Sequence, residues 1–130
     1  MLKKKLGTEA IERDWEYDGV ISYFKSPSTL VIPKSVWKIG DRAFECCWWL
    51  RKVTIPKSVD VIGYKAFQWC VNLKKVEIPN SVWKIGAYAF YNCYNAEIIL
   101  KKPESKFKIG GNAFWSCKIV VDYVNEKTRT

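Results

Sequence analysis

Ile39-Gly40-Asp41-Arg42-Ala43-Phe44-Glu45-Cys46-Cys47 decides the fold of this chain, because the pattern recurs. Residues 62–70 repeat it as Ile62-Gly63-Tyr64-Lys65-Ala66-Phe67-Gln68-Trp69-Cys70, and it returns at residues 85–93 and 109–117. Glycine, proline and cysteine all recur at steps of 23, 23 and 24 residues. A constant period of this length is typical of a solenoid, in which each repeat forms one coil and stacks on the next.

Each repeat predicts the same local structure. Val53-Thr54-Ile55 alternates in hydrophobicity, as a strand with one buried face does, and Pro56 ends the strand because it lacks a backbone N–H. The glycine of each repeat is expected to permit a turn that other residues resist. Ala43, Phe44 and Cys47 have helical spacing. We therefore expect a narrow parallel sheet on one side of the stack and short helical turns on the other.

The residues Leu50-Arg51-Lys52-Val53-Thr54-Ile55-Pro56-Lys57-Ser58-Val59 resemble the repeat unit of the BspA-like (treponemal-type) leucine-rich-repeat family. The resemblance covers about residues 30–121. It implies an α/β repeat fold: a right-handed solenoid of about four 23-residue repeats, with the parallel sheet concave and the helical turns convex. BspA-like repeats are usually found in adhesins and surface-interaction proteins, so the resemblance also implies a binding function.

Three segments are predicted. Residues 1–29 form an N-terminal cap with a β-hairpin around the turn pair Asp18-Gly19, residues 30–121 form the repeats, and residues 122–130 form a C-terminal tail. The unit at residues 96–103 departs from the pattern by an extra residue. The sequence therefore leaves open which residues of its strand face the core and which face outward. Within the repeats, Phe44, Phe67, Phe90 and Phe114 are expected to form one buried column.

The composition argues against an enzyme. The chain contains no histidine, which removes the commonest general base and metal ligand, and its acidic residues fall at varied repeat positions. We predict no catalytic residue, no cofactor and no metal. The cysteines at 47, 70, 93 and 117 are expected to stack as reduced, metal-free core thiols, with Cys46 facing outward.

Two sets of side chains indicate a partner. The formal net charge is +9, and residues 1–29 contribute none of it because five basic and five acidic residues cancel there. Lysines recur at strand entries, and aromatic residues recur after the prolines and on the predicted helical side. On the helical side, the residues expected to be exposed are Trp48, Trp49, Trp69, Tyr91, Tyr94 and Trp115. The predicted partner-binding residues are Trp37, Trp83, Phe107, Arg51, Lys52, Lys74, Lys75, Trp48 and Trp49. The alternative for the lysines is a role in solubility and in protecting strand edges.

These surfaces leave several functions open. We expect a protein-binding module for a partner with an acidic surface, such as a small intracellular effector or inhibitor. Nucleic-acid or nucleoprotein binding is the alternative that the basic, aromatic-interleaved face suggests, and a fragment of a surface adhesin is another. Stacking of a glycan on Trp37 and Trp83 is a further alternative. The start lacks the apolar core of a signal peptide, which predicts a cytoplasmic protein if Met1 is the natural start and a surface location if the chain is an excised fragment.

Overall fold

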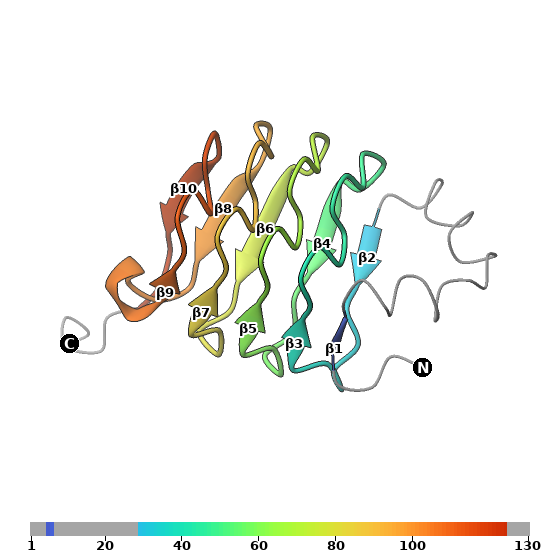
Figure 1. Cartoon of the computed structure of the whole chain (residues 1–130). Helices are drawn as coiled ribbons and strands as arrows, with labels where there is room; N and C mark the ends of the chain where they lie inside the picture. Colours follow the sequence, from blue (N-terminus) through green and yellow to red (C-terminus); the bar gives the residue numbers. More distant parts are fainter. Residues whose placement is uncertain (1–4, 7–28, 125–130) are drawn as a thin grey trace.

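The computed structural model describes residues 5–6 and 29–124, which wind into stacked coils bearing two five-stranded parallel sheets (Figure 1). The first sheet contains β2 (Thr29–Val31), β4 (Lys52–Thr54), β6 (Lys75–Ile78), β8 (Glu97–Leu100) and β10 (Lys118–Val121). The second sheet contains β1 (Lys5–Leu6), β3 (Lys38–Ile39), β5 (Val61–Ile62), β7 (Lys84–Ile85) and β9 (Lys108–Ile109). The predicted hairpin at Asp18-Gly19 and the tail from residue 125 lie outside the described residues.

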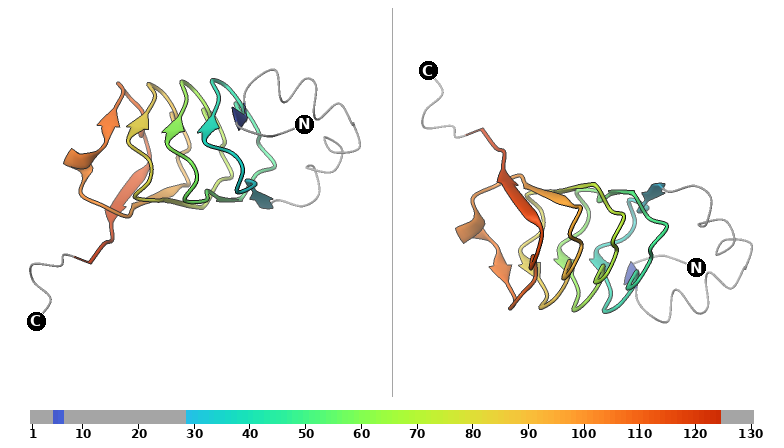
Figure 2. Two further views of the ribbon diagram at one scale, coloured as in Figure 1. Left: turned by 90° about the horizontal axis from the view of Figure 1, so that it is seen from below. Right: turned by 90° about the horizontal axis from the view of Figure 1, so that it is seen from above.

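Equal repeat positions stack on one another. Lys52 lies opposite Lys75 between β4 and β6, and Ile39 lies opposite Ile62 between β3 and β5. This register follows from the period, because one 23-residue repeat makes one coil. Both views in Figure 2 show the coils side by side along one axis. The solenoid of parallel strands, with about four coils, is confirmed; the second sheet was not predicted.

The core consists of continuous rows of apolar side chains. The rings of Phe44, Phe67 and Phe90 are buried and stack at centroid distances of 5.4 and 5.1 Å, and Phe114 continues the column at 5.8 Å. The predicted strand faces are also confirmed: the side chains buried under the first sheet include Val53, Ile55, Val76 and Ile78, and those exposed on it include Thr54 and Glu77. Shared rows of this kind bury apolar area that no single repeat could bury alone.

The expected helical turns are not confirmed. The segment after β3 forms four-residue turns: the N–H of Ala43 donates to the C=O of Gly40 (3.2 Å), and the third turn residue, Arg42, has a φ of 58°. The next N–H, that of Phe44, donates instead to the C=O of Ala66 in the following repeat (2.7 Å). Along this segment, every second N–H donates to a carbonyl within the turn, and the others donate to carbonyls of the next repeat. None of them is therefore left to donate to the carbonyl of the fourth preceding residue, which is the bond that defines an α-helix.

The only helix in the described residues is the 3-10 helix η1 (Glu104–Lys106), which follows Pro103 in the repeat that carries the extra residue. In this part of the chain, no helix has the length and hydrophobicity that crossing a bilayer requires.

The repeat glycines serve a different purpose from the one expected. None of the described glycines has a positive φ, so the backbone there is accessible to other residues. A Cβ added at Gly86, however, would lie 2.6 Å from the Tyr64 nitrogen, and one added at Gly110 would lie 2.4 Å from the Ala87 nitrogen. Glycine is therefore required by the close approach of successive coils, and the expectation of a turn conformation is wrong.

The structure shows which residues of the irregular repeat's strand, β8, face the core. Glu97 takes the position of Lys75, and Ile98 takes that of Val76, so the apolar face of β8 still points into the core. The additional length lies beyond this strand and includes η1, which separates β8 from β9. As a result, the row of lysines on the first sheet ends at Glu97.

Candidate functional site

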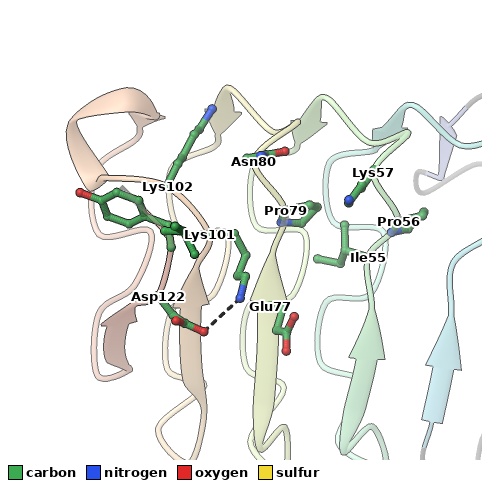
Figure 3. A pocket seen from close by; sticks show the side chains of 11 residues that line it. Ile55, Pro56, Lys57, Glu77, Pro79, Asn80, Lys101, Lys102 and Asp122 are labelled. Carbon is green, nitrogen blue, oxygen red and sulfur yellow. Dashed lines mark hydrogen bonds and ion pairs between the residues drawn. The ribbon is translucent and has the colours of Figure 1, made fainter. Parts of the chain in front are cut away.

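The exposed face of the first sheet carries a hollow of about 360 Å³. It is lined by Lys52, Val53, Thr54, Ile55, Lys75 and Glu77. A groove of about 620 Å³ lies where the strands of this sheet end (Figure 3), and its lining includes Lys57, Asn80, Lys101, Lys102 and Asp122. Ile55 and Glu77 line both, so the hollow and the groove adjoin, and we call the two together the sheet depression.

The hollow at one end of the sheet depression is lined by a pair of lysines. Lys52 and Lys75 are direct register partners on adjacent strands, and both are exposed. Like charges opposite each other in a sheet cost roughly a few tenths of a kcal/mol. Arg51 and Lys74, also exposed, are linked by a backbone hydrogen bond from the N–H of Lys74 to the C=O of Arg51 (2.9 Å). The next member of the row, Glu97, is paired with Lys118 (N–O 3.6 Å).

The groove has a mixed polar wall. Lys101 donates to Asp122 (3.0 Å; Figure 3). This hydrogen bond raises the pKa of Lys101. The ammonium of Lys102 lies 4.6 Å from the centroid of the Phe107 ring, a cation–π contact, and burial lowers the pKa of Lys102. Cations thus occur along the whole sheet depression, with Glu77 between its two parts.

Two of the three predicted aromatic side chains after the prolines are exposed. Trp37 is 44% exposed and Trp83 is 52% exposed. Asp60 separates them by backbone hydrogen bonds, because its N–H donates to Trp37 (2.7 Å) and its C=O accepts from Trp83 (2.9 Å). The tryptophans are therefore two coils apart, on the order of 10 Å. Neither lines the hollow or the groove.

Phe107 was predicted to be a partner-binding residue, but the structure places it in the core. It occupies the repeat position of Trp37 and Trp83, but only 7% of it is exposed and it belongs to the core. Two features of its own repeat accompany this burial: η1 directly precedes it, and the Lys102 side chain lies over its ring. Phe107 offers no surface to a partner.

The turn side of the stack carries further aromatic residues. Trp48 is 57% exposed and packs edge-on against the half-buried Trp49 at 5.6 Å between centroids. The predicted exposure is confirmed for Trp48, Trp69, Tyr94 and Trp115, whereas Trp49 and Tyr91 are half-buried. Trp48 and Trp49 precede β4 by a few residues, but neither of them lines the sheet depression.

The sequence interpretation missed one arrangement on this side. The Lys65 ammonium lies between two tyrosine rings, 5.1 Å from the centroid of Tyr64 and 5.8 Å from that of Tyr88. Tyr64 and Tyr88 are successive turn residues 24 positions apart, whereas the repeat spacing is 23, so a search for equal positions passes over them.

The groove residues Lys57, Asn80 and Asp122 were also missed. Two of them directly follow Pro56 and Pro79, so their place after the strand-ending proline was the available indication.

The cysteines form hydrogen bonds between coils. Cys70 and Cys93 are fully buried, and their thiols donate to the carbonyls of Phe44 (3.1 Å) and Phe67 (3.0 Å). Burial raises the pKa of Cys47 to about 12. Cys46 is exposed, as predicted. Among residues 5–6 and 29–124, no group of three or more histidine, cysteine or acidic side chains is arranged to hold a metal ion.

Comparisons with known proteins agree with this geometry. The model of the BspA type leucine rich repeat region, with six copies, matches residues 21–128. A leucine-rich repeat protein from Bacteroides ovatus ATCC 8483 is 29% identical with a TM-score of 0.63, over 71% of this chain and 24% of that chain. The T. pallidum leucine rich repeat protein TpLRR is 26% identical with a TM-score of 0.58, over 67% of this chain and 53% of that chain.

The chain thus spans about a quarter of the first of these structures and about half of the second. No curated protein sequence gives a significant match. The period, the stacked rows and a family match over most of its length show that the chain belongs to the BspA-type leucine-rich-repeat family.

Proposed function

We propose that this chain is a non-enzymatic binding module whose sheet depression takes an acidic segment of a partner protein. Leucine-rich repeats typically act as protein-interaction modules, which supports the general class. One observation carries the finer proposal: Lys52 and Lys75 are paired directly on the exposed sheet, beside a hollow that adjoins a second lysine-containing groove.

The charges in the depression favour a specific acidic ligand. A carboxylate placed between Lys52 and Lys75 would relieve the repulsion between these two ammonium groups. Lys57 and Lys102 extend the positive wall toward the groove. Glu77 would repel a carboxylate placed at the junction of hollow and groove, so the positions of acidic groups along the partner would determine whether it fits.

Trp37 and Trp83 supply the apolar part of the proposed site. In each repeat, the tryptophan lies between the proline that follows the first-sheet strand and the second-sheet strand, β3 or β7. A partner that contacts both the sheet depression and the tryptophans must therefore extend around the turn that contains the proline. Burial of such aromatic side chains commonly contributes most of the affinity of an interface. Exposed lysines mainly accelerate association and make binding sensitive to salt.

The lysine pair is tested with a fluorescein-labelled peptide of alternating Glu and Ser residues, titrated with the protein at low and high sodium chloride. Lys52→Glu with Lys75→Glu should slow association, and most of that effect should disappear at high salt. The matched control is Lys84→Glu with Lys108→Glu, an equal charge change at register partners on the second sheet. Equal losses in both double variants would contradict a site on the first sheet and leave only net charge as the cause.

The aromatic contribution is tested with the same probe. Trp83→Ala should weaken binding by more than about 1 kcal/mol, mainly through faster dissociation. The control is Trp115→Ala, which removes a tryptophan of similar exposure (57%) from the turn side. If the Trp115 variant abolishes binding while the lysine and Trp83 variants bind normally, the interface lies on the turn side. A random-sequence oligonucleotide that binds more tightly than the peptide would instead favour nucleic acid as the partner.

A further inference from the structure

The last coil exposes side chains that are buried in every other described coil. Ile119 of β10 is 38% exposed, whereas its register partner Ile98 is 0% exposed; Val121 is 45% exposed, whereas Leu100 is 0% exposed. The corresponding side chain at the opposite end of the first sheet, Leu30 of β2, is only 7% exposed. Among the described residues, the stack is therefore open at its β10 end, which Figure 2 places at one extremity of the coils.

Among the described residues, no strand pairs with the outer edge of β10. The N–H groups of Lys118 and Asp122 donate to β8 and the residue after it, at the carbonyls of Ala96 (3.0 Å) and Leu100 (2.8 Å). Because peptide groups alternate in direction along a strand, the N–H and C=O groups of Ile119 and Val121 point away from β8. Exposed edges of this kind readily pair with another strand.

The sequence of this edge is complementary to itself. Residues 118–122 read Lys118-Ile119-Val120-Val121-Asp122, with a cation at one end, three apolar residues between, and an anion at the other. Antiparallel pairing of two copies about Val120 places Lys118 of one copy opposite Asp122 of the other. It also places Ile119 opposite Val121, the two residues whose peptide groups point outward, so each such pair can exchange two hydrogen bonds.

We propose that the β10 edge is a twofold interface with a second copy of this chain. The two first sheets join edge to edge through antiparallel β10 strands, and the uncovered ends of the two cores meet beside them. A twofold axis through Val120 makes the contact self-complementary and closes the assembly as a dimer. Phe114 and Ile109 are half-buried in the last coil and belong to the end of the core that the second copy would face. This inference rests on observations other than those behind the proposed peptide site, although Asp122 belongs to both surfaces.

The first test measures oligomeric state by sedimentation velocity over a concentration series of the full chain. The wild type should convert from monomer to dimer as concentration rises. Val121→Lys places an inward-pointing charge on the edge strand and should raise the dimer dissociation constant at least about tenfold. Val31→Lys, at an exposed valine (67%) on the opposite edge strand β2, is the matched control and should dimerise like the wild type.

The second test checks the register and does not depend on a loss of structure. Lys118→Glu leaves two anions to face each other across the axis, and Asp122→Lys leaves two cations, so each variant alone should stay monomeric. An equimolar mixture restores both opposite-charge pairs and should form a heterodimer. A wild type that stays monomeric throughout the concentration series would overturn the proposal. So would a dimer that is lost in the Val31 variant but kept in the Val121 variant. A mixture of the two charge variants that stays monomeric would overturn it as well.

Discussion

Replacing Gly86 by alanine should destabilise the protein through the contact between coils. The new Cβ would lie 2.6 Å from the Tyr64 nitrogen and 2.7 Å from the Gly63 carbonyl carbon, whereas ordinary contacts begin at 3.4 Å, a shortfall of about 0.8 Å. Both obstructing atoms are backbone, so no side-chain rotation can relieve the clash. Overpacking costs about 1–3 kcal/mol, and lengthening the nearby ladder bond from Gly86 to Ile62 (2.8 Å) adds about 1 kcal/mol. We expect a loss of about 3 kcal/mol.

Urea unfolding followed by tryptophan fluorescence and circular dichroism measures this loss. The matched control is Gly111→Ala, because a Cβ at Gly111 meets nothing within 4 Å and its φ is not positive. That variant should be as stable as the wild type or slightly more stable, by up to about 1 kcal/mol. If Gly86→Ala costs less than about 1 kcal/mol, the close approach of coils does not require glycine. Equal losses at both positions would show that the conformational freedom of glycine, and not the clash, is what matters.

Two further predictions concern the core. Phe67→Ala, in the middle of the stacked column, should lower the free energy of unfolding by about 3–5 kcal/mol, and Phe114→Ala at its open end should cost clearly less; equal losses would contradict the column. Chelator and mild reductant should leave the melting temperature unchanged, and stoichiometric zinc or a large drop with reductant would contradict a reduced, metal-free core. At pH 8, iodoacetamide should label Cys46 in the native protein but not Cys47, whose pKa of about 12 leaves almost no thiolate. Since the ordinary thiol pKa is 9.0, the contribution of Cys47 to stability is complete below pH 9 and is lost as the pH rises toward 12.

Much of the proposed binding surface followed from register alone. Once the period was known, Lys52 and Lys75 had to be neighbours on one sheet face, and Trp37 and Trp83 had to be two coils apart with Asp60 between them. Equal repeat positions occupy equal places in a solenoid, so linear spacing translates directly into distance. Phe107 shows the limit of this argument, because a local departure, the 3-10 helix η1, precedes it and it lies in the core.

The path of the backbone between strands could not be read from the sequence. Ala43, Phe44 and Cys47 have helical spacing, yet the segment forms turns, because its N–H groups divide between the local turn and the carbonyls of the next coil. Hydrophobic spacing reports which side chains face inward, and both a helical turn and a tight β-turn satisfy it. The hydrogen-bond partner in the next repeat is a long-range contact that local propensity does not contain.

By itself, the sequence determined the solenoid, its repeat length, the inward rows and the basic and aromatic surfaces, since each follows from residue type and a period that maps one repeat onto one coil. Only the tertiary structure decided how closely the coils approach, and hence why Gly86 is glycine. It also decided that a hollow and a groove adjoin on the first sheet and that, among the described residues, Ile119 and Val121 of β10 are exposed. These features depend on how closely the coils stack, which arises from contacts between residues distant in the chain.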